Sequence, residues 1–97
     1  MIHISGIRIY PFETPDIGGR IRAYAEITLD ASLLLKGLRV IEGTRGGLFV
    51  AFPAQRGRDR RYHDLVIPLD AETREYIRTT VIEAFKRWTP STETTKG

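Results

Sequence analysis

Apolar side chains occupy every second position between residues 21 and 29. They are Ile21, Ala23, Ala25, Ile27 and Leu29, and polar or aromatic side chains fill the positions between them. Because successive side chains of a β-strand point to opposite faces, this period of two predicts a strand with one face in the core and the other in water. It is the clearest periodic signal in the chain.

Residues 2–10 also favour a strand, because four of them are β-branched isoleucines. These isoleucines lie at even positions before Gly6 and at odd positions after it. A bulge at Gly6 would return them to one face, so we expect a bulged strand. Pro11 lacks an N–H, which places this strand at an end or an edge of the sheet, and a loop rich in proline and glycine follows to residue 19.

Three more strands are expected before Pro68. Residues 33–42 are nearly continuously apolar, which is typical of a central strand. Glycines at 43, 46 and 47 permit a hairpin turn into residues 48–52, which are apolar on both faces. We expect this fourth strand to be the most buried one, with one side under a helix and the other under a partner. Residues 62–67 form the fifth, short strand.

The apolar spacing changes to three and four residues after Asp70. The positions that share this spacing are Thr73, Tyr76, Ile77, Thr80, Val81, Ala84, Phe85 and Trp88. They predict a helix over residues 71–88 that docks one stripe on the sheet, with Asp70 as N-cap, Glu72 in the first turn and Pro90 ending it. The fold class is therefore α+β: an antiparallel sheet of about five strands with a C-terminal helix, in one domain of residues 1–88. Residues 89–97 contain no apolar side chain and are predicted to be a disordered tail.

Composition excludes several classes of protein. The 97 residues suffice for one core. The chain has no cysteine, which excludes disulfides and thiolate chemistry and is compatible with the cytoplasm. Neither a secretory signal nor an apolar run long enough to cross a membrane is visible, so we expect a cytoplasmic protein.

Positive charge is concentrated in the middle of the chain. Seven basic and three acidic residues lie between Lys36 and Asp64, whereas the remainder carries eight basic and nine acidic residues. Four of the basic residues fall within six positions: Arg56, Arg58, Arg60 and Arg61. A sheet that holds such a loop presents guanidinium groups to a polyanion, so these four are candidate contacts to phosphates and base edges of DNA or RNA. Lys36, Arg39 and Arg45 would extend the surface. The alternative is a solvated loop whose charges keep the protein soluble.

The remaining candidates for chemistry are few. His63 and Asp64 could act as a base and its orienting carboxylate, but neighbours on a strand point to opposite faces. No catalytic or phosphate-binding motif accompanies them, so we expect no enzyme, no metal, no cofactor and no small-molecule substrate. Asp64 is expected to hold the loop or to pair with Arg74. Tyr62 could stack on an unpaired base, although we favour a place in the core.

Several short segments, in order and at matching gaps, resemble the stage V sporulation protein G (SpoVG) family, once described as septation regulators. The segments are ITLD at 27–30, LRVIEG at 38–43 and GLFVAFP at 47–53, followed by Tyr62, Asp64, Pro68, Thr73 and Arg74. The resemblance covers nearly the whole domain. It implies a small α+β homodimer that binds DNA and RNA to regulate gene expression in bacteria, with links to sporulation, septation and cell division.

The basic loop departs from the family pattern. Ala54 and Gln55 precede Arg56, so that only Arg56 carries over a basic position that the family has there. The family's loop centre reads Thr-Pro-Asp-Gly-Glu, where this chain has the residues Gly-Arg-Asp-Arg-Arg at 57–61. Basic charge is thus redistributed, which bears on the preferred target sequence. The alternative function is a protein-interaction module in a division or regulatory assembly, which would use the apolar sheet face or the helix.

Overall fold

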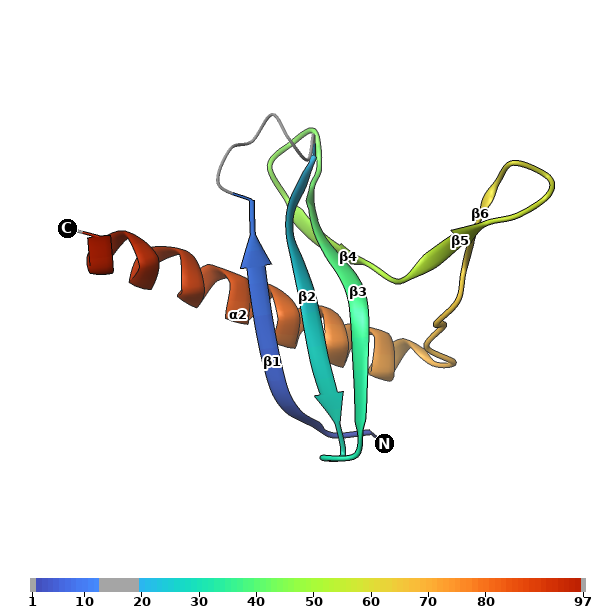
Figure 1. The fold of residues 1–97 in the computed structure, drawn as a ribbon, viewed down its shortest axis with the longest axis horizontal. Helices are drawn as coiled ribbons and strands as arrows, with labels where there is room; N and C mark the ends of the chain where they lie inside the picture. Colours follow the sequence, from blue (N-terminus) through green and yellow to red (C-terminus); the bar gives the residue numbers. More distant parts are fainter. Residues whose placement is uncertain (1, 13–19, 97) are drawn as a thin grey trace.

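The structure, a computed structural model, describes residues 2–12 and 20–96, with side chains placed as far as residue 88. Its elements are β1 (Ile4–Pro11), β2 (Ile21–Leu29), β3 (Leu33–Glu42), β4 (Leu48–Ala51), β5 (Ala54–Arg56), β6 (Tyr62–Asp64) and α2 (Ala71–Lys96). Within the described residues, a four-stranded antiparallel sheet, a two-stranded sheet and a C-terminal helix make the fold α+β, as predicted (Figure 1). Most of the loop predicted after the first strand, residues 13–19, lies outside the described residues.

The main sheet has the order β1-β2-β3-β4, and each neighbouring pair runs antiparallel. β2 and β3 are therefore its central strands, and their bounds match the strands predicted at 21–29 and 33–42. The register of β1 against β2 shifts between Ile4 and Gly6, which confirms the predicted bulge. β1 ends at Pro11 on the edge of the sheet, where a residue without an N–H is tolerated.

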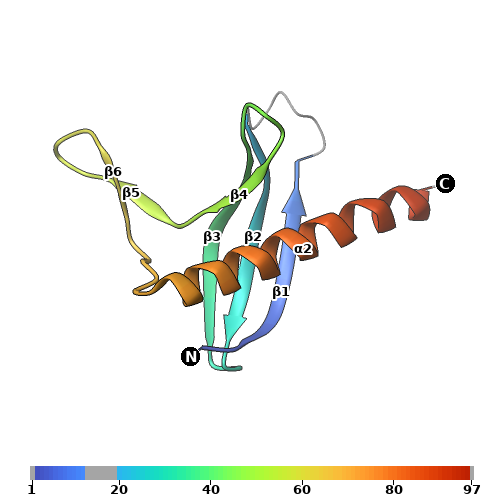
Figure 2. The ribbon, with the colours of Figure 1, turned by 180° about the vertical axis from the view of Figure 1, so that it is seen from behind.

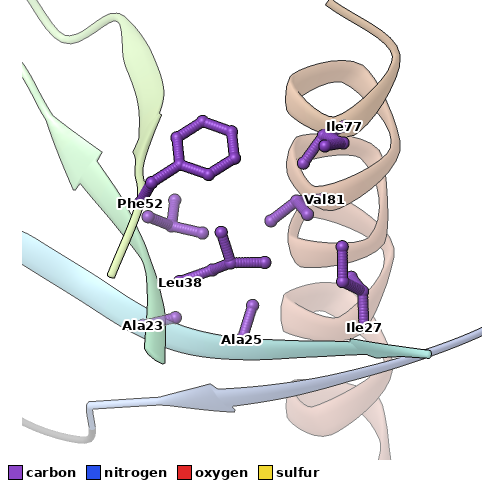
Figure 3. Packing of buried hydrophobic residues seen from close by; sticks show 8 residues of the cluster. Ala23, Ala25, Ile27, Leu38, Phe52, Ile77 and Val81 are labelled. Atoms are coloured by element: carbon purple, nitrogen blue, oxygen red, sulfur yellow. The ribbon is translucent and has the colours of Figure 1, made fainter. Parts of the chain in front are cut away.

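Helix α2 crosses one face of this sheet, as two opposite views show (Figure 1, Figure 2). The fully buried side chains of β2 and β3 belong to Ala23, Ala25, Ile27, Leu38 and Val40. Ile77 and Val81 of α2 pack against them, together with Phe52 (Figure 3). Most of the positions predicted by the two periodicities are thus buried or partly buried, but Trp88, at the end of the predicted stripe, is 37% exposed. Ile82, which lies beside the predicted stripe, is buried as well.

Asp70 caps the N-terminus of α2 as predicted. Thr73 N donates to Asp70 Oδ1 at 2.7 Å, and this hydrogen bond lowers the pKa of the Asp70 carboxyl. The predicted end at Pro90 is wrong, because α2 continues to Lys96. A proline inside a helix removes one backbone hydrogen bond, which kinks a helix without always ending it. A separate tail at 89–97 stays a prediction. No helix in the described ranges is long and apolar enough to cross a membrane.

β4 is not the most buried strand, contrary to the prediction. It is the edge strand beside β3, and the fully buried strand side chains all belong to β2 and β3. Since alternate side chains of a strand face α2, Phe49 points to the uncovered face and is 46% exposed. Apolar composition on both sides of a strand does not show which side the helix covers. A partner over the uncovered side stays a prediction.

The strand predicted at 62–67 is shorter than expected and lies outside the main sheet. Only Tyr62–Asp64 form β6, which pairs with β5 in a separate hairpin. The hairpin ladder ends where Leu65 N donates to Pro53 O at 2.7 Å, because Pro53 has no N–H to continue it. The hairpin projects from the side of the main sheet, so the arginines are carried away from the core (Figure 1).

Candidate nucleic-acid interface

The four arginines predicted to bind nucleic acid all lie on the β5–β6 hairpin, residues 54–64, which we call the arginine hairpin. Arg56 ends β5, and Arg58, Arg60 and Arg61 lie in the turn formed by residues 57–61. All four are exposed, and none forms an ion pair with a carboxylate of the described residues. A guanidinium without a carboxylate partner keeps its donors available for phosphate oxygens.

Two backbone hydrogen bonds close the turn. Arg60 N donates to Gly57 O at 3.0 Å, and Gly57 N donates to Arg61 O at 2.8 Å. Arg60 has a φ of 66°, as in hairpin loops of three residues whose last residue is left-handed. This conformation costs a residue with a Cβ roughly 1–2 kcal/mol. A glycine at this position would not be strained, whereas Arg60 is. We therefore take as a working hypothesis that the side chain of Arg60 has a function.

Asp59 and His63 fasten the turn from one side. His63 Nε2 lies 3.0 Å from both Oδ1 and Oδ2 of Asp59, and Arg61 N donates to Asp59 Oδ1 at 3.0 Å. The His63 contact and then the Arg61 N–H hold the pKa of the Asp59 carboxyl below its ordinary value. Gly57 lies against this pair, because a Cβ there would come within 2.9 Å of His63 Cδ2 and 3.0 Å of Asp59 Oδ1. The turn is therefore shaped by its own residues before any ligand binds.

The Asp59–His63 pair was missed by the sequence analysis, which weighed His63 against its neighbour Asp64. Asp59 lies within the turn and His63 on β6, so their contact depends on the register of the hairpin, which the sequence pattern did not give. Asp64 was predicted to hold the loop or to pair with Arg74, and it lies at the base of the hairpin opposite Ala54. No ion pair of the described chain joins it to Arg74, although both line a pocket of about 300 Å³ between β4, β6 and the start of α2.

Tyr62 was predicted to be a core residue, and this prediction is wrong. Its side chain is 72% exposed, on a hairpin that projects away from the main sheet and α2 (Figure 1). Arg56 and Tyr62 are cross-strand partners, so their side chains lie on one face of the hairpin, while Gln55 and His63 share the other. One face therefore combines a cation with an exposed aromatic ring. That combination can stack on an unpaired base and bind its phosphate.

The three residues predicted to extend the surface are placed elsewhere. Arg45 is exposed in the turn between β3 and β4, separate from the arginine hairpin. Arg39 lies half-buried on β3, where its Nη2 donates to Phe52 O at 2.8 Å. Lys36, also on β3, forms an ion pair with Glu26 at 3.7 Å. The structure thus brings together the four arginines of the hairpin but gives Arg39 and Lys36 partners within the chain. A role in binding for these three stays a prediction.

A model of the SpoVG family matches residues 2–87. The chain belongs to the SpoVG family. A relative named "Putative septation protein SpoVG" from Myxococcus xanthus is 34% identical over 86 residues, which cover 89% of this chain and 82% of the relative. A relative named "Putative septation protein SpoVG 2" from Listeria monocytogenes is 37% identical over 86 residues, 89% of this chain and 80% of that protein. The resemblance inferred from ITLD, LRVIEG and GLFVAFP is confirmed.

The loop pattern given with the resemblance above has glycine at the position that Arg60 holds. Glycine adopts a φ of 66° without strain, so a glycine at this position would fit the backbone of the turn. Arg60 places a charged side chain at this strained position. Arg58 and Arg60 flank Asp59, and with Arg56 and Arg61 the hairpin carries four arginines against two aspartates.

The lowered pKa of Asp59 gives a pH prediction. The support that ionised Asp59 gives to the turn is present above the pKa of an unfolded aspartate and is lost as the pH falls through its lowered folded pKa. In an acid titration followed by NMR, we expect the Arg61 amide signal to shift with a midpoint below that of an ordinary aspartate. The variant Asp59→Asn should abolish this titration. A midpoint at or above the ordinary value would contradict the assigned hydrogen bonds.

Proposed function

We propose that this SpoVG family member is a regulatory protein that binds DNA or RNA through the arginine hairpin. One observation carries the proposal: the four arginines are exposed on a projecting hairpin and have no carboxylate partner in the described chain. Arginines that only kept a protein soluble would need neither a fixed turn nor a strained position. Contacts from several guanidinium groups to phosphates supply most of the affinity of sequence-independent nucleic-acid binding.

The geometry supports a division of roles along the hairpin. Arg58, Arg60 and Arg61 occupy the closed turn, where guanidinium groups can reach successive phosphates. Arg56 and Tyr62 share one face, where a base taken out of a stack could lie on the ring. Hydrogen bonds within the turn already fix its backbone. Binding would therefore restrict few further backbone torsions, which reduces the entropic cost of association. We propose no catalytic role for the Asp59–His63 pair, because its contacts serve to hold the turn.

The direct test is a titration of labelled 20-nucleotide probes with the protein, followed by fluorescence anisotropy. A single-stranded RNA, its DNA counterpart and a DNA duplex should each bind at 50 mM salt. If four phosphates are contacted, the affinity for the duplex should fall by roughly 150-fold when the salt is raised to 200 mM, because bound counterions are released. Absence of binding to all three probes at the lower salt would reject the proposal.

Replacing Tyr62 by alanine should weaken binding of the single-stranded probes by roughly 5- to 150-fold. The reason is that stacking of one base on an aromatic ring contributes about 1–3 kcal/mol. The variant Tyr62→Phe keeps the ring and is the matched control, with an expected affinity near that of the parent. Duplex binding should change little, because its bases stay stacked on each other. Equal losses for duplex and single strands would place Tyr62 outside the base-binding surface.

We also propose that the chain forms a homodimer. The edge strand β4 offers unpaired backbone groups beside Phe49, and open strand edges tend to pair with another chain. Light scattering at micromolar concentration should give about twice the chain mass of 11.0 kDa. A single species at the mass of one chain, unchanged with concentration, would contradict the homodimer.

A protein-interaction role in septation or another regulatory assembly is the second candidate. The uncovered face of the main sheet favours it, because Tyr10, Tyr24 and Phe49 are exposed there. The relatives carry the word septation in their names. This role predicts association that persists at high salt, since apolar contacts are not screened, whereas phosphate contacts are.

A further inference from the structure

The outward-facing backbone groups of edge strand β1 follow from its hydrogen-bond pattern. Phe12 N donates to Arg22 O at 3.0 Å. Because hydrogen-bonded pairs alternate along an antiparallel ladder, the even-numbered residues of β1 after the bulge point their N–H and C=O groups at β2. The N–H and C=O groups of Ile7 and Ile9 therefore face away from the sheet.

Both ends of this edge are closed. Ile4 N, which lies before the bulge, donates to Tyr76 Oη of α2 at 2.8 Å. Pro11, at the other end, has no N–H to leave unpaired. Between these ends, β1 pairs only with β2 among the described residues. Ile7 and Ile9 thus form a short open stretch of sheet edge that could accept one further strand.

A groove of about 600 Å³ lies beside this stretch, between β1 and the C-terminal half of α2. Its apolar lining includes Ile7, Ile9, Ala84 and Trp88. The backbone of α2 continues past β1 (Figure 2), so it overhangs the place where a further strand would lie. Its 26 residues extend for about 39 Å, whereas four strands span about 14 Å between their outer axes. An added strand would therefore lie partly under the helix.

The charged groups at this groove are positive. Arg8 and Arg87 line it, no described lining residue is acidic, and neither arginine forms an ion pair with another described residue. We infer that the open edge of β1, residues 7–9, binds an extended acidic peptide segment of a partner protein. The segment adds as a fifth strand through Ile7 and Ile9. Arg8 lies opposite Glu26 on the face away from α2, whereas Arg87 lies on α2, so the segment binds both arginines with acidic residues that point to its two faces.

Two other occupants fit this edge less well. A second copy of β1 would bring Arg8 toward Arg8 and Arg87 of the first, and like charges across a strand pair repel each other. A nucleic acid could bind both arginines, but its backbone offers no alternating N–H and C=O groups for Ile7 and Ile9. The edge thus differs in chemistry from the arginine hairpin, whose exposed groups include four guanidinium groups.

The test uses the full chain and three labelled hexapeptides. The first is Glu-Val-Asp-Glu-Val-Asp, which places acids on both faces of a strand, the second has lysine at each acidic position, and the third is the acidic peptide with every amide N-methylated. Anisotropy measures affinity, and amide hydrogen exchange locates the site. The acidic peptide should bind and slow exchange of the Ile7 and Ile9 amides, while the other two should bind at least about tenfold more weakly.

Protein variants then test the role of the two arginines. The double variant Arg8→Gln and Arg87→Gln should weaken the acidic peptide by up to about 25-fold, since one exposed ion pair changes affinity by up to about fivefold. The control double variant Arg20→Gln and Arg45→Gln removes the same charge elsewhere and should bind as the parent does.

Three results would overturn the inference. The first is an acidic peptide that leaves exchange at Ile7 and Ile9 unchanged or binds no better than the lysine peptide. The second is a single-stranded oligonucleotide that slows the same amides as strongly. The third is slow exchange without peptide that increases with protein concentration, because a second copy would then occupy the edge.

Discussion

Replacing Leu38 by alanine is expected to lower the free energy of unfolding by about 2–5 kcal/mol. Leu38 is 0% exposed on the central strand β3, and its side chain points toward Val81 of α2 (Figure 3). Truncation would leave a cavity in the layer between sheet and helix, where neighbouring side chains cannot all move in to fill it. Because domains of this size are stable by only about 5–15 kcal/mol, the variant would lose a large share of its stability.

Leu34 provides the matched control for this substitution. It is the same residue type on the same strand, but its side chain is 54% exposed on the uncovered face. Leu34→Ala should therefore change stability by less than about 1 kcal/mol. Urea denaturation followed by circular dichroism measures both variants. Equal losses for the two would show that the helix-covered face of β3 has been assigned wrongly, or that a partner covers Leu34 in solution.

Replacing the four arginines of the hairpin together by glutamine should remove most nucleic-acid binding while leaving the fold intact. All four side chains are exposed, so the melting temperature should stay close to that of the parent. If each guanidinium contacts one phosphate of a duplex, the loss at 0.15 M salt amounts to roughly a thousandfold in affinity, from counterion release. This is the largest effect on function that we expect.

Four cations of α2 supply a control of equal charge. Arg74, Arg78, Lys86 and Arg87 are all exposed, and none lies on the hairpin. Their joint replacement by glutamine changes the net charge by the same amount but should cost far less affinity, because it removes only long-range attraction. A control variant that loses as much binding as the hairpin variant would mean that total charge, rather than the arrangement on the hairpin, determines binding.

Local signals predicted the parts of the fold that depend on neighbouring residues. The alternation at 21–29, the change of phase across Gly6 and the N-cap at Asp70 each involve interactions within a strand pair or a helix turn. The register of side chains in such elements is a geometric consequence of the backbone. For this reason the buried face of β2 and the docking stripe of α2 could be read from the sequence alone.

Burial at the edges and in the hairpin depends on tertiary placement, which these local patterns do not contain. Phe49 and Tyr62 are aromatic residues on strands, and both are exposed because nothing in the described chain packs on their faces. β5 was missed because its three residues, which end at Arg56, carry no alternation of apolar side chains. The four arginines of the hairpin could be located from the sequence, but the Asp59–His63 pair required the register of the hairpin.

The most direct test of the arginine hairpin is the salt dependence of duplex binding, measured for the parent and for the variant with Arg56, Arg58, Arg60 and Arg61 changed to glutamine. We predict that the slope of log affinity against log salt flattens in the variant by roughly 3.6 for one hairpin, and by about twice that if a dimer places both hairpins on phosphates. The same affinity and the same slope in both proteins would contradict the hairpin as the binding surface.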